Sequence, residues 1–368
     1  MEYIKIKDIL EFKKKSKIKA SEGLKIGKYN FYTSSKEQNK FLDYYEYSNE
    51  ALIIGTGGNA NIHHSYGKFS VSTDCFVLEN KDNKIFLVEY IYKYLLKNIH
   101  ILENGFRGIG LKHISKEYLE NIEIPIISIE KQKKLIKNLK NIDTFIDKNK
   151  QIKNELNFLN KSLFTRMFGD IKNNDKGWEI KKLGDVVQTQ YGTSKKATST
   201  VTGFPILRMN NITYSGEMDY KDLKYIELSD SEKEKFLLKK GELLFNRTNS
   251  KELVGKTGLF NLDIPMAFAG YLIRIKPSNL IHSKFLLFFM NSEFMKKLLY
   301  NKAKNIVGMA NINAKELEDF SIILPPIELQ NKFAERVEKI EKLKFEIEKS
   351  IEIAQNLYDS LISKYFDN

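Results

Sequence analysis

Two long segments of the chain place apolar residues at alternating steps of three and four. In the segment that begins at residue 327 these positions are Phe333, Val337, Ile340, Leu343, Ile347, Ile351, Ala354, Tyr358, Leu361 and Tyr365. In the segment that begins at residue 129 they are Leu135, Leu139, Ile142, Phe145, Ile152, Leu156, Leu159, Leu163 and Met167, with an interruption at Asn149. Such spacing is typical of the seam of a coiled coil. Each segment therefore predicts a helix of about 38 residues, roughly 57 Å long at ~1.5 Å per residue.

The residues at the ends of these segments are suitable helix boundaries. Two prolines at 325–326 close an extended stretch, and Glu328 follows in the first turn, where a negative charge favours the helix dipole. In the first segment Ser128 is a suitable N-cap and Glu130 takes the place of the glutamate. Gly169 predicts the end of the first helix.

The chain also contains an internal repeat that includes both segments. "GIGLKHISKEYLENIEI" at 108–124 aligns with "IVGMANINAKELEDFSI" at 306–322, at an offset of 198 residues, and the register holds without a gap for 60 residues. Near the front, "YIKIKDIL" resembles "WEIKKLGDVV" at an offset of 177, so the second copy has 21 extra residues in its front part. The chain is thus a tandem of two units, each a variable globular part followed by a constant helical tail.

The globular parts predict strands with short helices. "ALIIGTGG", "KFSVSTDCFVLE", "GELLFNRT" and "MAFAGYLIRIK" are apolar runs bounded by turn residues, whereas "FLVEYIYKYLLKN" and "KFLLFFMNSEFMKKLL" are typical of buried helices. We predict an α+β fold of two α/β domains in a tandem pseudo-repeat, each followed by a long helix. The predicted boundaries are 1–128 for the first domain, 129–168 for its helix, 169–177 for a linker, 178–326 for the second domain and 327–368 for its helix.

Charge predicts that the two helices pair with each other as an antiparallel coiled coil. Residues 129–177 carry 12 Lys and Arg against 6 Asp and Glu, whereas residues 327–368 carry 7 against 9. Opposite charge bias on two seams of equal length favours a heterotypic pair.

Composition excludes several classes of site. Cys75 is the only cysteine, which rules out an internal disulfide and a cysteine-cluster zinc site. His63 and His64 are neighbours and point apart on a strand, so we expect no metal site. Because the sequence has neither a run of 18 apolar residues nor the apolar core of a signal peptide, we expect a cytoplasmic location.

The net charge of +13 predicts an acidic partner, with nucleic acid favoured over membrane. The basic residues gather in loops that also contain Asn, Ser, Thr and Tyr, the residue types that contact phosphates and base edges. Solvated surface is the alternative for any one loop. Candidate DNA-binding residues in the first domain are Lys14, Lys15, Lys17, Ser34, Lys36, Asn59, Asn61, His63 and Arg107. In the second domain they are Tyr191, Thr193, Lys195, Lys196, Arg208, Asn210, Arg247, Asn249, Lys251 and Lys304.

Two short motifs favour an enzyme but lack the rest of its chemistry. "FRGIG" at 106–110 fits the pattern with which adenine methyltransferases bind S-adenosylmethionine, yet the required Asn/Asp-Pro-Pro-aromatic tetrapeptide is missing, because Ile327 follows the only Pro-Pro. We interpret it as a DNA-facing loop. "GKT" at 255–257 is no P-loop, because Ser250 stands where its first glycine is needed. A coiled-coil scaffold that binds nucleic acid without sequence specificity remains the alternative function.

Two variable domains, each followed by a long helix with a P-P-x-E-x-Q type motif, resemble the DNA-specificity (S) subunit of type I restriction-modification systems. The motif residues are Pro325, Pro326, Glu328 and Gln330 in the second copy, and Glu130 and Gln132 in the first. The first copy departs from the motif, with Ile127 and Ser128 in place of the two prolines. The segments "GFPILRMNNI", "GELLFNRT" and "VGKTGLF" also resemble the family's target-recognition domains.

The resemblance implies a non-catalytic subunit in which each domain reads one half of a bipartite target in double-stranded DNA. It also implies that the helices set the spacing and bind two methyltransferase subunits, with the six motif residues as partner-binding positions, and that endonuclease/translocase subunits join the complex. No cofactor is then expected in this chain. S-adenosylmethionine would be bound by the methyltransferase, and ATP and Mg by the endonuclease.

Overall fold

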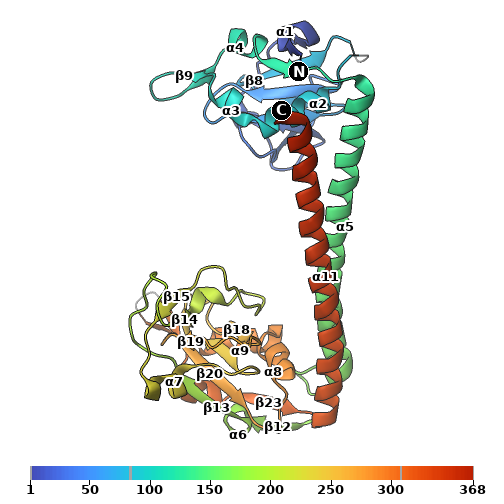
Figure 1. Cartoon of the computed structure of the whole chain (residues 1–368). Helices are drawn as coiled ribbons and strands as arrows, with labels where there is room; N and C mark the ends of the chain where they lie inside the picture. Colours follow the sequence, from blue (N-terminus) through green and yellow to red (C-terminus); the bar gives the residue numbers. More distant parts are fainter. Residues whose placement is uncertain (1, 83–84, 307–308, 368) are drawn as a thin grey trace. The chain divides into compact units, whose positions relative to one another are not determined.

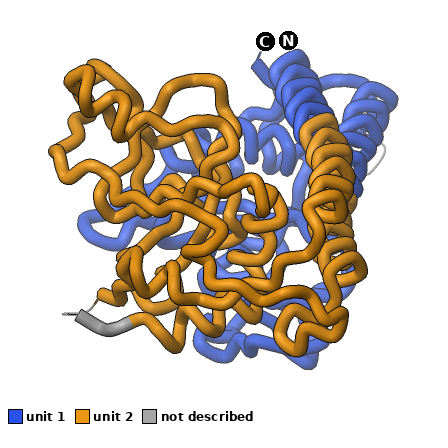
Figure 2. The backbone as a smooth tube through the Cα atoms, turned by 90° about the horizontal axis from the view of Figure 1, so that it is seen from below, with its two compact units in different colours: residues 1–151, 348–368 blue, residues 152–347 orange. Residues whose placement is uncertain are grey.

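The computed structural model describes residues 2–82, 85–306 and 309–367. The chain divides into two compact units, unit 1 with residues 1–151 and 348–368, and unit 2 with residues 152–347 (Figure 2). Both division points lie inside a long helix. Each unit therefore combines one globular domain with a part of both helices.

The two long helices are α5 (Ile129–Phe168) and α11 (Ile327–Phe366), each of 40 residues (Figure 1). The hydroxyl of Ser128 accepts from the Lys131 N–H at 3.4 Å, as expected of an N-cap. After α5, Gly169 has a φ of +81°, and its N–H donates to the Thr165 carbonyl at 2.7 Å. Ser128 and Gly169 thus take the cap and stop positions of α5 that the sequence predicted.

The helices pack against each other in antiparallel orientation within each unit. In unit 1, Ile142 and Ile146 of α5 form a buried cluster with Ala354 of α11. In unit 2, the ring of Phe164 lies 5.5 Å from that of Phe333, near the start of α11. Low residue numbers of one helix therefore meet high numbers of the other, which confirms the predicted antiparallel pair.

The predicted seam is only partly buried. Its positions Phe145, Ile152, Leu159 and Leu343 are exposed. These four apolar positions therefore keep much of their surface in solvent although they belong to the predicted seam. One helix covers a single stripe of another, and apolar residues outside that stripe remain in solvent.

Unit 1 is built on a four-stranded antiparallel sheet in the order β2-β8-β5-β6, beside a three-stranded sheet in the order β4-β3-β7. Its strands are β1 (Tyr3–Lys5), β2 (Leu10–Phe12), β3 (Tyr29–Tyr32), β4 (Lys40–Leu42), β5 (Ala51–Gly55), β6 (Ile62–Ser65), β7 (Phe69–Val71), β8 (Cys75–Asn80), β9 (Phe106–Arg107), β10 (His113–Ile114) and β11 (Glu123–Pro125). Its shorter helices are α1 (Ile6–Ile9), η1 (Ala20–Glu22), α2 (Val88–Lys97), α3 (Ile99–Glu103) and α4 (Lys116–Glu120). Leu135 and Leu139 of α5 pack into its main core.

Unit 2 has the equivalent sheets, β13-β20-β16-β18 and β15-β14-β19. Its strands are β12 (Glu179–Lys182), β13 (Val187–Tyr191), β14 (Phe204–Leu207), β15 (Lys224–Ile226), β16 (Leu243–Asn246), β17 (Thr248–Asn249), β18 (Thr257–Leu259), β19 (Ala267–Phe268), β20 (Leu272–Pro277), β21 (Lys304–Ile306), β22 (Met309–Asn311) and β23 (Ser321–Leu324). Its shorter helices are α6 (Leu183–Val186), η2 (Met209–Asn211), α7 (Asp230–Phe236), α8 (Ser283–Met290), α9 (Glu293–Lys302) and α10 (Ala314–Glu318).

The strand pairing repeats from one unit to the other. β3 pairs antiparallel with β4 and parallel with β7, and β14 pairs in the same way with β15 and β19. β1 pairs with β11 as β12 pairs with β23. The internal repeat found in the sequence is therefore also a repeat of topology, which confirms the predicted tandem of two mixed α/β domains. The domain limits drawn above stay a prediction.

Candidate nucleic-acid interface

Three loops of unit 1 meet where β5 ends. The hydroxyl of Ser34, in the loop after β3, accepts from the Thr56 N–H at 3.1 Å and donates to the Asp74 carbonyl at 2.6 Å. The carbonyl of Thr56 in turn accepts from the N–H of Ile114 in the β9–β10 hairpin, at 3.1 Å. The hydroxyl that the sequence offered as a DNA contact is thus used to join the loops that would carry such contacts.

The predicted polar residues after β5 differ in how they are presented. Asn59 is exposed, whereas Asn61 is buried and donates to the Asn59 carbonyl at 3.0 Å. Nε2 of His63 donates to the Ser35 carbonyl at 2.7 Å, and its ring lies 5.2 Å from that of Tyr32. Burial lowers the pKa of His63, so the imidazole is neutral near pH 7. Asn59 is therefore the best placed of the three to contact a ligand.

The predicted basic residues of unit 1 lie on its surface. The exposed members are Lys14, Lys15, Lys17, Lys36 and Arg107. The Lys15 ammonium lies 5.1 Å from the ring centroid of Phe76, a cation–π distance. Exposed cations can reach phosphates without giving up a buried partner, and all five stay predictions as DNA contacts.

Unit 2 builds the same junction with different side chains. The carbonyl of Arg247, which directly follows β16, accepts from the N–H of Ile312 at 2.9 Å, the counterpart of the bond that joins the hairpin in unit 1. The guanidinium of Arg247 lies 4.9 Å from the ring centroid of Tyr191, whose hydroxyl accepts from the Ala314 N–H at 2.9 Å. Two predicted residues from strands far apart in sequence therefore meet beside the second hairpin, β21–β22.

The loop after β13 contains three further predicted residues. Thr193 is buried, and its N–H donates to the Phe268 carbonyl at 3.0 Å. Nζ of Lys195 lies 2.7 Å from the carboxylate of Glu232, and this hydrogen bond is the main reason that the pKa of Glu232 falls to about 2. Lys196 is exposed. Lys196 is therefore the residue of this loop that is best placed for a phosphate.

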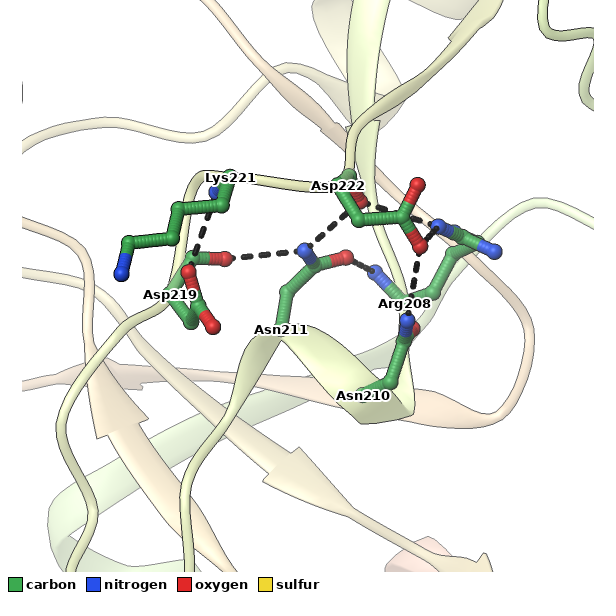
Figure 3. Close-up of polar contacts among 6 residues, drawn as sticks. All are labelled: Arg208, Asn210, Asn211, Asp219, Lys221 and Asp222. Carbon is green, nitrogen blue, oxygen red and sulfur yellow. Dashed lines mark hydrogen bonds and ion pairs between the residues drawn. The ribbon is translucent and has the colours of Figure 1, made fainter. Parts of the chain in front are cut away.

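Arg208 and Asn210 converge on one carboxylate (Figure 3). Nη2 of Arg208 lies 2.8 Å from Oδ2 of Asp222, and Nδ2 of Asn210 lies 3.2 Å from the same oxygen. Asn211 is buried, and its amide donates to the main-chain carbonyls of Asp219 and Asp222. The exposed Asp222 thus accepts from Nη2 of Arg208 and from the amide of Asn210, two side chains that the sequence offered as DNA contacts.

The remaining predicted residues of unit 2 lie around the β17–β22–β21 sheet. Oδ1 of Asn249 accepts from the Ser250 N–H at 2.9 Å. The ammonium of Lys251 lies 4.6 Å from the ring centroid of Tyr300. Lys304 begins β21, and its side chain is outside the described part of the structure.

The two motif glutamines have a structural role. Gln132 is 0% exposed. Its Oε1 accepts from the Leu87 N–H, and its Nε2 donates to the carbonyls of Ile85 and Ile127, all three bonds at 2.9 Å. Gln132 therefore fastens the start of α5 to the segment that leads into α2.

Gln330, also 0% exposed, makes the equivalent bonds in unit 2. Its Oε1 accepts from the His282 N–H at 2.8 Å, and its Nε2 donates to the carbonyls of Leu280 at 3.2 Å and Pro325 at 2.8 Å. The side chains of Gln132 and Gln330 are thus enclosed and hydrogen-bonded within the chain, and the partner contact of these residues stays a prediction.

The other motif residues divide by exposure. Glu130, Glu328 and Pro326 are exposed, whereas Pro325 is buried. The two glutamates lie in the first turn of their helices, as predicted. Of the motif, only the exposed residues can reach a partner in this conformation.

Sequence reasoning missed the apolar tip of the β9–β10 hairpin. Ile109 and Leu111 are exposed there, next to Lys112 and His113. The two glycines of "FRGIG" were the available sequence signal that the isoleucine is exposed, because an apolar residue between two glycines is a poor core position. The pattern was compared with a cofactor-binding motif and interpreted as a DNA-facing loop, without regard to the exposure of its isoleucine.

Residues 2–82, 85–306 and 309–367 contain neither a metal cluster nor a membrane-spanning helix. No group of three or more His, Cys, Asp or Glu side chains in this part of the chain could hold a metal ion. No helix within it is long and apolar enough to span a lipid bilayer.

The duplicated junction of hairpin and loops can be compared with known families. The family described as the type I restriction modification DNA specificity domain matches residues 1–157 and 175–355, which is most of both units. The chain belongs to this family. It carries two specificity domains in tandem, and the resemblance stated from the motif residues is confirmed.

Similar specificity subunits come from archaea and bacteria. The type I restriction enzyme MjaVIII specificity subunit of Methanocaldococcus jannaschii is 27% identical over 317 residues, which cover 80% of this chain and 73% of that protein. The EcoKI specificity subunit of Escherichia coli is 26% identical over 279 residues, 70% of this chain and 60% of that protein. The crystal structure of a type I restriction-modification S subunit from M. genitalium shares the fold, with a TM-score of 0.66 at 15% identity, and the alignment covers 99% of this chain and 96% of that one.

Proposed function

We propose that this chain is the DNA-specificity subunit of a type I restriction-modification system, and that each unit reads one half of a bipartite target. The observation that carries the proposal is the duplicated junction. In both units a hairpin bonds to the residue that follows the third strand of the main sheet, through Ile114 and Thr56 in unit 1 and Ile312 and Arg247 in unit 2. The framework is the same in the two units and the side chains on it differ. Such an arrangement suits two different half-sites.

The long helices are suited to set the distance between the half-sites. Each is a single helix of 40 residues, roughly 60 Å at ~1.5 Å per residue. Exposed apolar residues along α5, among them Phe145, Ile152 and Leu159, follow one another at seven-residue spacing and therefore lie on one face. Exposed apolar stripes are typical of protein interfaces. We propose that methyltransferase subunits bind there, that they supply the bound S-adenosylmethionine, and that an endonuclease/translocase with ATP and Mg completes the complex.

Mapping methylated bases tests the proposal directly. Genomes of cells that express the methyltransferase with and without this chain are sequenced for modified bases. We expect a split sequence to be methylated only when the chain is present. Methylation without sequence preference, or equal binding of DNA and RNA, would favour a nonspecific scaffold instead.

Single variants then assign the half-sites. Arg107→Ala in unit 1 and Lys196→Ala in unit 2 each remove one exposed cation from a candidate loop, and Lys137→Ala removes an exposed cation from α5 as a matched control. We expect the first two to weaken DNA binding and the control to leave it unchanged. If the arginine in unit 1 reads a base, its loss should relax one half-site only.

A further inference from the structure

The β9–β10 hairpin of unit 1 presents two apolar side chains to solvent. Ile109 is 107% exposed and Leu111 is 73% exposed, so the first is fully in solvent and the second is largely so. Gly108, with a φ of +136°, and Gly110, with a φ of +87°, flank the isoleucine. Both angles suit glycine, so the backbone that projects Ile109 is specified by the sequence.

The base of the hairpin is fixed to the candidate interface. His113 pairs with Arg107 across the hairpin, and Gly58 donates its N–H to the Lys112 carbonyl at 3.2 Å. Ile114 is bonded to the loop after β5, as described above. The tip is therefore held at a set position relative to the exposed Asn59. In Figure 1 the hairpin projects from the body of unit 1 on the side away from α5.

Charge around the tip favours a polyanion. Arg107, Lys112 and His113 flank the two apolar residues and are exposed, and the sequence from 104 to 116 contains no Asp or Glu. An exposed apolar pair within a basic rim matches the two surfaces of a duplex, phosphates outside and a stack of bases inside. Two side chains on a narrow hairpin are too small a patch for a stable protein interface, which needs about 800 Å² per partner.

We propose that the β9–β10 hairpin is a wedge that inserts Ile109 and Leu111 between base pairs of double-stranded DNA, at or beside the half-site of unit 1. The inference rests on the proposed function. Apolar wedges of this kind unstack and kink a duplex, and flexible pyrimidine–purine steps yield most easily. A methyltransferase must take its target base out of the stack, so a step that is already unstacked makes that extrusion easier.

In unit 2 the counterpart of Ile109 is Val307, which lies outside the described residues. Met309 occupies the position of Leu111 in the repeat, at the offset of 198, and is 47% exposed. The proposal is therefore made for the hairpin of unit 1.

The test uses the full-length chain and a duplex of its mapped target with 2-aminopurine in place of one adenine at a time. Unstacking raises the fluorescence of this base. We expect an increase at one step in or beside the half-site of unit 1 when the wild-type chain binds. The variants are Ile109→Asn and Leu111→Asn, which keep side-chain size and remove apolar character. We expect each to lose the increase and to bind about tenfold more weakly, the order expected for an apolar side chain that is no longer buried.

Two controls make the result specific. Ile85→Asn changes another exposed isoleucine of unit 1, 54% exposed and away from the hairpin in sequence, and should keep both signals. Ile109→Phe keeps a large apolar side chain and should restore the fluorescence increase. Thermal unfolding of every variant checks that the fold is intact, as expected for changes at exposed positions.

Three other outcomes would each contradict the wedge or the proposed function. Selective binding of wild-type chain without any fluorescence increase would overturn the wedge and leave the proposed function intact. Loss of methyltransferase binding in the hairpin variants, with DNA binding unchanged, would make the tip a protein contact and would also overturn the wedge. If the wild-type chain does not select DNA by sequence, the proposed function itself fails.

Discussion

Replacement of Gln330 by alanine tests the interpretation of the motif glutamine as a fastening inside unit 2. The change removes three hydrogen bonds, those to His282, Leu280 and Pro325, from a side chain that is 0% exposed. A lost hydrogen bond costs about 1 kcal/mol, and more where the remaining group is buried. The bond to the Pro325 carbonyl is itself buried. We expect the free energy of unfolding of unit 2 to fall by about 3 kcal/mol.

Urea unfolding followed by tryptophan fluorescence is a suitable assay. Trp178 is the only tryptophan of the chain, and it lines the same cleft as Leu280 and Pro325. With a slope of about 2 kcal/mol per M, the expected loss moves the urea midpoint down by roughly 1.5 M. Gln330→Met keeps the length of the side chain without its hydrogen bonds, and should recover only the part of the loss that is due to packing.

Glu328→Ala is the matched control, because this side chain is exposed on the first turn of the same helix. It removes a favourable interaction with the helix dipole, which is worth about 0.5 kcal/mol. If Gln330→Ala unfolds at the wild-type urea concentration but no longer binds the methyltransferase, the glutamine is a partner contact and the reasoning is refuted. An equal loss for both variants would likewise contradict the hydrogen-bond argument.

Four further predictions follow from the structure. The purified chain alone should transfer no methyl group from S-adenosylmethionine to target DNA, and should support transfer once a methyltransferase subunit is added; transfer by the chain alone would contradict a non-catalytic role. Lys196→Ala should weaken binding to all DNA sequences and reduce the slope of log K against log salt by about one unit, as measured in a titration from low to high salt. Arg208→Ala and Arg247→Ala should alter only the half-site of unit 2, and a change in the other half-site would contradict the assignment of units. A heptad inserted in both helices, after Gln151 and after Ile347 where the units divide, keeps the seam in register and adds about 10 Å to each helix. Methylome sequencing should then show the spacer longer by about three base pairs, at ~3.4 Å each, and an unchanged spacer would mean that the helices do not measure distance.

The periodicity was readable from the sequence because it involves residues only a few positions apart. The repeat was readable because two segments of the same chain can be compared directly. Spacing of apolar residues fixed the helices, and local signals such as Ser128 and Gly169 fixed the ends of the first one. The offset of 198 residues predicted a duplication that the strand pairing repeats. The basic loops were also evident, and the family match agrees with the function that they suggested.

Only the tertiary structure decided which side chains are exposed and which are held by hydrogen bonds within the chain. In the sequence Gln132 and Gln330 are only members of a motif; the structure shows that they are buried, with hydrogen-bond partners in segments about 45 to 50 residues away in sequence. Arg208 read as a free base reader and is held by Asp222, on the far side of a loop. In each case the deciding partner is distant along the chain, and no local pattern records it.

The same reason explains the apolar positions. Phe145 and Leu139 both occupy apolar positions of the heptad pattern. The fold buries Leu139 and leaves Phe145 exposed. At the hairpin, sequence suggested a turn from its glycines, and the structure showed that the isoleucine between them meets nothing in its own chain. Sequence determined the two long helices and the cap and stop of the first, because turn preferences and the hydrogen bonds of a helix are local. The exposure of a side chain depends on whether another segment covers it, and this is decided when distant segments of the chain pack together.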